Sequence, residues 1–138
     1  MNPRGTNCYQ QKNALNALYC PHLFVSLQRE YKRDMDREHV IKDIQQVASR
    51  VLPKGSTLYL YGSRARGDYH EESDWDLLIL LDKQSLEAAD YGVAYPFREL
   101  GWEIGEELNP SLYTKKQWES WSYLPYHKNV EHDKIVLL

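Results

Sequence analysis

Two aspartates separated by one residue are the strongest candidates for chemistry in this chain. Asp74 and Asp76 begin the segment Asp-Trp-Asp-Leu-Leu-Ile-Leu-Leu, whose apolar run predicts an interior strand over residues 74–81. Residues two apart on a strand face the same side, with Cα atoms about 6.5 Å apart. Two ionised carboxylates at that separation repel by roughly 2–3 kcal/mol at an effective dielectric of about 20. A divalent cation turns this repulsion into coordination, and hard oxygen ligands suit Mg²⁺ or Mn²⁺.

The simpler interpretation of the pair needs no cation. Asp74 could cap the loop before the strand, and Asp76 could pair with an arginine. However, two carboxylates at the start of an apolar strand do not stabilise the fold, because burial removes their hydration. The pair alone therefore leaves both interpretations open.

A second candidate lies at the dipeptide Gly62-Ser63. Gly62 follows a β-rich run over residues 57–61, and Ser63 opens a short helix. Glycine lets a ligand approach the backbone, and the hydroxyl and N–H groups at a helix start suit a phosphate. Taken alone, the dipeptide is better explained as a tight turn with a capping serine, because such turns are common.

Basic residues follow this turn. The short helix carries Arg64 and Arg66, which add positive charge beside a bound phosphate, and it is closed by Gly67. The segment is not a P-loop, because Gly67 is followed by Asp68 and not by Lys-Ser/Thr.

Taken together, these residues resemble the nucleotidyltransferase superfamily typified by DNA polymerase beta, and most closely the small prokaryotic minimal nucleotidyltransferases (the MNT group). The motif there is Gly-Ser, a short basic helix, and Asp-x-Asp on the next strand. Gly62-Ser63 and Asp74-Trp-Asp76 match it, and the resemblance is best over residues 36–81. It implies an α/β fold, with a small mixed β-sheet and helices packed mainly on one face.

The resemblance also implies an activity and a site. A nucleoside triphosphate would lie on Gly62-Ser63, with Arg64 or Arg66 neutralising phosphate charge. Asp74 and Asp76 would hold two Mg²⁺ ions, or Mn²⁺ in their place. The expected reaction is transfer of a nucleoside monophosphate, AMP from ATP, to a hydroxyl of a protein or small molecule. MNT proteins often work beside a helical HEPN partner as a toxin–antitoxin pair, so such a partner is expected. The alternative is a nucleotide-binding or partner-sequestering module of the same fold without catalysis.

Active members of the family have a third carboxylate on a later strand. Glu107 is the best candidate here, because it begins the run over residues 108–113 that predicts a strand. Glu103 and Glu106 are alternatives, and a solvated helix end would explain all three equally well. Without a third carboxylate, nucleotide could still bind while turnover falls sharply.

The remaining elements must position these residues. An apolar stripe at Val40, Ile44, Val47 and Val51 predicts a helix that begins at Asp34 or Asp36 and ends at Pro53. Residues 82–100 predict a helix that is weakened or kinked at Gly92 and Pro96, and Pro110 predicts a bulge or an edge position in the strand after it. A capping box at 114–117, a helix from Pro125 and a final strand or tail over 135–138 complete the chain.

The character of the sequence changes at Met35. Residues 1–34 are expected to be an N-terminal extension in which Leu15, Leu18 and Leu23 could form a short helix, and residues 35–138 are expected to form the nucleotidyltransferase domain. One hypothesis is that Met35 is the natural start.

Composition excludes several classes of protein. The chain has 138 residues and a net charge of −3, which suits one globular domain and disfavours a broad electrostatic grip on duplex nucleic acid. No run of 18 apolar residues exists, so no membrane association is expected. Cys8 and Cys20 form no CxxC pair, and adding His22 makes no zinc site, so free thiols in a cytoplasmic protein are predicted.

Aromatic residues gather late in the chain. Either core packing or a partner-binding surface could explain Trp102, Trp118, Trp121, Tyr123 and Tyr126.

Overall fold

A computed structural model describes residues 21–138 of the chain. The predictions for Cys8, Cys20 and a helix at Leu15 and Leu18 lie outside these residues. By its internal contacts the chain divides into two units, one ending at Val40 and one running from Ile41 to Leu138. The second unit contains the sheet and every predicted site residue.

The helix α2 (Pro21–Val51) begins earlier than the sequence suggests. A start at Asp34 or Asp36 is wrong, because the helix already runs through both positions. No glycine or proline interrupts residues 22–34, and a proline is tolerated in the first turn of a helix. The predicted apolar stripe is confirmed, since Ile44 and Val47 are buried, and the helix ends at Val51, two residues before Pro53.

Four strands form a mixed sheet. These are β1 (Thr57–Tyr61), β2 (Trp75–Leu81), β3 (Leu108–Thr114) and β4 (Ile135–Val136), in the order β3-β2-β1-β4. β1 pairs antiparallel with β2 and with β4, while β2 and β3 run parallel. The expected α/β class with a small mixed sheet is confirmed. The central place of β2 explains why its sequence is apolar on both faces.

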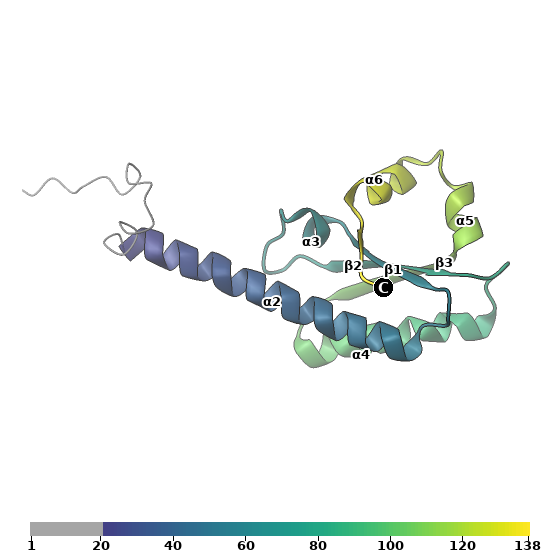
Figure 1. The fold of residues 1–138 in the computed structure, drawn as a ribbon, viewed down its shortest axis with the longest axis horizontal. Coiled ribbons are helices and arrows are strands. Elements are labelled where there is room, and N and C mark those ends of the chain that lie inside the picture. Colours follow the sequence, from purple (N-terminus) through teal and green to yellow (C-terminus); the bar gives the residue numbers. More distant parts are fainter. Residues whose placement is uncertain (1–20) are drawn as a thin grey trace, which may run out of the picture. The chain divides into compact units, whose positions relative to one another are not determined.

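Figure 1 shows helices on both sides of the sheet, and alternation along β2 divides its residues between the two faces. On one face Leu78 and Leu80 form a buried cluster with Trp118 of α5 (Lys115–Ser120) and Val130 of α6 (Pro125–Asp133). On the other face lie Trp75, Leu77, Ile79 and Leu81, next to α4 (Tyr95–Ile104) and the part of α2 from Ile41 onward. The longer helices cover one face, as expected, and two short helices cover part of the other.

The connection between β2 and β3 differs from the expected single helix. Residues 82–87 are not helical, a 3-10 helix η2 covers Ala88–Val93, and α4 follows it. Pro96 lies in the first turn of α4, where a missing N–H costs no helical bond, so it starts this helix instead of kinking one.

β3 is an edge strand of the described sheet, as Pro110 predicts. The backbone N–H of Trp75 donates to the carbonyl of Glu107 at 2.8 Å, so Glu107 faces β2. Alternation then turns the backbone of residues 108, 110 and 112 toward the open edge. Pro110 consequently lacks its N–H at a position where the ladder with β2 does not use one.

The helices after β3 follow their sequence signals. Thr114 accepts from the backbone of Gln117, and Gln117 accepts in return, which confirms the predicted capping box of α5. Among the helices that the structure describes, none is both long enough and apolar enough to cross a membrane.

Candidate active site

Asp76 occupies the centre of the candidate site because its strand is paired on both sides. Its Cα partners are Tyr61 on β1 and Asn109 on β3. Residues paired in this way face the same side, so these three side chains share the sheet face that α5 and α6 partly cover. Asp74 stands one residue before β2, close enough to Asp76 for its charge to raise the pKa of that carboxyl. The predicted carboxylate pair therefore interacts electrostatically, and its metal-binding role stays a prediction.

Gly62 brings the predicted phosphate-binding turn against Asp76. Its φ of 74° and ψ of −158° form a backbone conformation that only glycine adopts readily. A Cβ at this position would lie 2.6 Å from Oδ2 of Asp76, inside any allowed contact distance. The short helix α3 (Ser63–Arg66) follows at once, and a left-handed Gly67 closes it as predicted. Glycine is therefore required at residue 62 both by its conformation and by the neighbouring carboxylate.

The negative charge of Asp76 is unfavourable at this position. Burial raises the pKa of this carboxyl above its ordinary value, the nearby charge of Asp74 raises it further, and Arg66 partly opposes them. Ionising Asp76 is therefore less favourable than ionising an aspartate in water. Bound cationic charge would relieve this, so the electrostatics fit a site that takes a divalent ion.

The structure gives Arg64 a role that the sequence did not suggest. This side chain is only 5% exposed, and its guanidinium donates to the carbonyls of Ser73 and Glu71 at 3.1 and 3.3 Å. It also lies 3.4 Å from a carboxylate oxygen of Glu106 and against the rings of Tyr69 and Trp75. These contacts tie the loop after α3 to the start of β3, so the guanidinium is already committed to protein groups. A contact between Arg64 and a phosphate stays a prediction that this geometry does not favour.

Arg66 is the better placed of the two arginines. It is exposed, and it donates to Asp68 and, at 2.7 Å, to Asp133 at the end of α6. Hydrogen bonds from His132 and from Arg66 lower the pKa of Asp133, which keeps this partner ionised. The positive charge of Arg66 also acts on Asp76, where it opposes the rise in pKa that burial and Asp74 cause. Arg66 therefore stays the predicted phosphate ligand.

The glutamates proposed as a third carboxylate are not gathered with the aspartate pair. Within residues 21–138, no group of three His, Cys, Asp or Glu side chains is positioned to hold a metal ion. Glu106 accepts instead from Nε1 of Trp75 at 3.0 Å and pairs with Arg64. Glu103 lies on α4, where it lines a cavity beside α2, and Glu107 is exposed one residue before β3. The metal-binding role of Glu107 stays a prediction without support from the side-chain positions.

Asn109 stands where a third ligand from β3 would be expected. It is the Cα partner of Asp76 and lies on the same face. Its amide oxygen is a hard ligand like a carboxylate oxygen, but it adds no negative charge. The sequence reasoning missed this residue because only the register of the parallel pair, set between strands far apart in the chain, brings it to Asp76.

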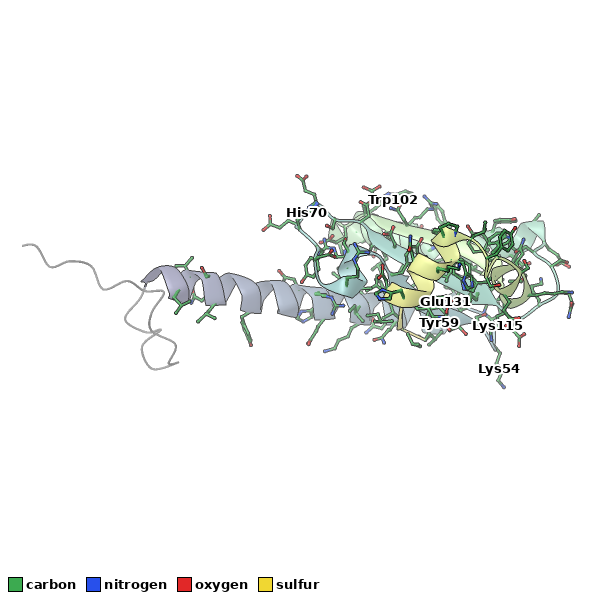
Figure 2. The ribbon with its side chains drawn as sticks, turned by 90° about the horizontal axis from the view of Figure 1, so that it is seen from above. Lys54, Tyr59, His70, Trp102, Lys115 and Glu131 are labelled. Atoms are coloured by element: carbon green, nitrogen blue, oxygen red, sulfur yellow. The ribbon has the colours of Figure 1, made fainter. Side chains whose placement is uncertain are left out.

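Side chains of α6 anchor this helix beside the site. The hydroxyl groups of Tyr61 and Tyr126 lie 3.0 Å apart, and burial raises the pKa of Tyr126. Glu131 accepts from Nε1 of Trp118 at 2.7 Å and from Lys134 at 2.8 Å. Although burial pushes the pKa of Glu131 up, these hydrogen bonds hold it below its ordinary value. Figure 2 shows Glu131 close to Tyr59, whose ring Lys134 covers at 4.3 Å.

The late aromatic residues divide between the core and the surface, so core packing is confirmed for part of them and a partner-binding role stays a prediction for the rest. Trp118 is buried in the cluster under α5 and α6, and Trp121 packs partly against it. Trp102 and Tyr123 are instead each 70% exposed.

Known proteins resemble this chain in both sequence pattern and fold. A family model described as a nucleotidyltransferase domain matches residues 28–138. No curated protein matches the sequence. A toxin–antitoxin crystal structure with AMP-PNP is 19% identical, with a TM-score of 0.53 over 71% of this chain and 72% of that chain. A mutant of the toxin–antitoxin MntA-HpeT is 15% identical, with a TM-score of 0.52 over the same shares, 71% and 72%. At these identities, the two structures establish a shared fold.

Proposed function

Because the chain belongs to the nucleotidyltransferase domain family, we propose that it transfers a nucleoside monophosphate, AMP, from a triphosphate to a hydroxyl of a protein or small molecule. One observation carries the proposal. A Cβ on Gly62 would lie 2.6 Å from Oδ2 of Asp76, so a turn suited to phosphates lies against a carboxylate suited to a divalent cation.

Each residue of the site has a distinct part in this reaction. The backbone at Gly62 and the hydroxyl of Ser63 bind the phosphates, and Arg66 neutralises their charge. Asp74 and Asp76 hold Mg²⁺ or Mn²⁺, two ions in the pattern of the family, and the amide oxygen of Asn109 adds a neutral ligand. When bound, such ions lower the pKa of an acceptor hydroxyl and stabilise charge on the triphosphate.

The atoms balance as in any nucleotidyl transfer. The acceptor oxygen forms a bond to the α-phosphorus, and the bond from that phosphorus to the bridging oxygen breaks. Pyrophosphate leaves with the electron pair, and the hydroxyl proton passes to water. The protein contributes mainly positioning and electrostatic stabilisation.

We further propose that ATP is the donor and that a HEPN-type toxin is the partner, in the cytoplasm. Two neighbours in fold are toxin–antitoxin structures, and one of them contains AMP-PNP, which supports both parts of the proposal.

Label transfer from ATP tests the proposed reaction. The full chain is incubated with ATP labelled at the α-phosphate, Mg²⁺ and candidate acceptors. We expect labelled acceptor, with transfer reduced at least about 100-fold in Asp76→Asn, because removing one carboxylate weakens stabilisation of the transition state by about 2.7 kcal/mol or more. Asp82→Asn changes an aspartate at the far end of β2 and serves as the matched control. Equal transfer by Asp76→Asn and Asp82→Asn would contradict the assignment.

A second function, nucleotide binding or partner sequestration without catalysis, is favoured by Asn109. The position beside Asp76 offers an uncharged amide, and no cluster of three acidic or histidine ligands exists in residues 21–138. Tight ATP binding without transfer, together with partner co-purification that survives Asp74→Ala plus Asp76→Ala, would establish this second function. Asn109→Asp separates the two, since it should raise Mn²⁺ affinity in either case but raise transfer only in an enzyme.

A further inference from the structure

The helix α6 is attached at both ends to residues that flank the phosphate-binding turn. In its first turn, the hydroxyl of Tyr126 lies 3.0 Å from that of Tyr61, which is the residue before Gly62. At its other end, Asp133 accepts a hydrogen bond of 2.7 Å from Nη1 of Arg66, the last residue of α3. Figure 1 shows α3 and α6 on the same side of the sheet. The helix α6 therefore contacts the chain both before and after the turn.

Arg66 is held close to the turn by the backbone of α3. Its N–H donates to the carbonyl of Gly62 at 3.0 Å, so the two residues are separated by one helical turn. The side chain of Arg66 is 44% exposed, and its charge acts on Asp76. For these reasons the proposed function assigns this guanidinium to the phosphates of the nucleotide.

The guanidinium of Arg66 is already bound by two carboxylates. Nε donates to both oxygens of Asp68, at 3.2 and 3.3 Å, and Nη1 donates to Asp133. Arginine binds carboxylates and phosphates through the same planar set of N–H donors. A phosphate that approaches Arg66 must therefore compete with these two aspartates for the same group.

Asp133 is the stronger of the two competitors. Its hydrogen bond is about half an ångström shorter than those of Asp68, and its side chain is 11% exposed against 64% for Asp68. Water and salt therefore screen the charge of Asp133 less. Hydrogen bonds from His132 and Arg66 lower the pKa of Asp133, which keeps it ionised near neutral pH.

We propose that Asp133 restrains nucleotide binding, because it holds Arg66 in an ion pair that a triphosphate must weaken before it can use the guanidinium. This inference rests on the proposed function, since it concerns regulation of the same site. Asp133 acts through Arg66 and is thus a positioning residue. The coupling is reciprocal, so any change that moves the end of α6 away from α3 should increase the affinity for nucleotide.

The remaining contacts fix the direction of the effect. When Asp133 is replaced, both oxygens of Asp68 still bind Nε, so the guanidinium stays oriented while it loses a competitor. The helix also stays attached, because Tyr126 remains beside Tyr61 and Glu131 still accepts from Nε1 of Trp118. Removal of the Asp133 charge should therefore increase nucleotide affinity.

Titration calorimetry of the full chain with ATP and Mg²⁺ tests the restraint. Asp133→Asn should bind ATP about fivefold more tightly than the unaltered chain. Glu131→Gln is the matched control, because it removes a charge from the same helix whose partners are Trp118 and Lys134, and it should leave ATP affinity unchanged. Asp68→Asn removes the weaker competitor and should tighten binding by a smaller factor. Melting temperatures confirm that the variants are folded.

Two further measurements show whether the effect passes through Arg66 and the phosphates. In the Arg66→Met background, Asp133→Asn should no longer tighten ATP binding. Inorganic tripolyphosphate, which has no base or sugar, should gain the same factor of about five from Asp133→Asn in the chain that keeps Arg66. A structural role of Asp133 would instead weaken the binding of both ligands.

The outcomes separate this proposal from the proposed function. Equal or weaker ATP binding by Asp133→Asn, or a larger gain from Asp68→Asn, would overturn the restraint alone. Tightening that persists in the Arg66→Met background, or that is absent for tripolyphosphate, would overturn it too. If neither the unaltered chain nor Asp133→Asn binds ATP, the proposed function fails and the restraint fails with it.

Discussion

The two faces of the seven-residue strand β2 differ in how completely they are buried. Trp75, Leu77, Ile79 and Leu81 face α4 and α2, and each is at most 1% exposed. On the opposite face Leu78 and Leu80 are buried under α5 and α6, but Asp76 at the open end remains partly accessible. The side chains on one face are fully buried, whereas on the other face burial is incomplete at Asp76. The alternation of a single strand thus separates the fully buried core from the proposed site.

The same separation divides the two arginines of α3. Arg64 is buried against Trp75 and Glu106 on the fully buried side, whereas Arg66 is exposed and lies within electrostatic reach of Asp76. Two residues from one turn thus differ in burial, and only Arg66 is proposed here as a phosphate ligand. Substitutions on the two faces of β2 and at the two arginines test whether stability and ATP binding depend on different residues.

The largest expected effect is on the fully buried face. Ile79→Ala should reduce the free energy of unfolding by about 3 kcal/mol, because it leaves a cavity in fully buried surroundings. Asp76→Asn on the other face should not reduce it, since burial and Asp74 already disfavour that charge. Urea denaturation followed by circular dichroism measures both. A comparable loss of stability in Asp76→Asn would break the comparison.

Substitution of Gly62 should affect both stability and ATP binding. Gly62→Ala should cost about 2 kcal/mol of stability and also weaken ATP binding, because the new Cβ is disfavoured at positive φ and meets Oδ2 of Asp76. Gly92→Ala is the control, since no atom lies within 4 Å of a Cβ at that position. Thermal denaturation and ATP titration measure the two effects. Unchanged ATP binding in Gly62→Ala would mean that the turn does not contact nucleotide.

The arginine pair should respond in opposite ways. Arg64→Met removes three hydrogen bonds from a buried group and should cost about 1.5 kcal/mol of stability. Arg66→Met removes an ion pair at the surface, so it should lower the melting temperature less than Arg64→Met does, and it should weaken ATP binding about fivefold. Paired measurements of melting temperature and ATP affinity decide the matter. The reverse pattern would show that Arg64, and not Arg66, serves the nucleotide.

The smallest expected effect is a response to cations that depends on pH. The pKa of Asp76 is raised above its ordinary value of 3.8, so this group favours folding below that value and opposes it as pH rises through the raised pKa. Mg²⁺ or Mn²⁺ should therefore raise the melting temperature by about 2 °C at neutral pH and by much less near pH 4. Differential scanning calorimetry measures the shift. A shift of equal size at both pH values, or one retained in Asp76→Asn, would exclude these carboxylates as the ligands.

Local signals made much of this architecture predictable. The apolar run of β2, the capping box at Thr114 and the glycine that closes α3 each act within a few residues of sequence. Such features are visible without knowledge of the partner elements. The electrostatic interaction of Asp74 with Asp76 follows from their spacing of two residues in the sequence.

Features that depend on contacts between distant segments could not be predicted from the sequence. Asn109 reaches Asp76 through the register of a parallel pair, and no local pattern encodes that register. Arg64 is buried and Arg66 is exposed because Arg64 alone contacts Trp75 and Glu106, which come from other segments. The early start of α2 was missed because its first half lacks the apolar stripe on which the prediction relied.

Pro110 gives the exposed margin of the sheet a further property. A foreign strand that tried to extend the sheet beyond β3 would find no hydrogen-bond donor at this residue, midway along its path. Edge-to-edge association of this chain with other polypeptides is therefore disfavoured at β3, and the strand can remain exposed without extending the sheet.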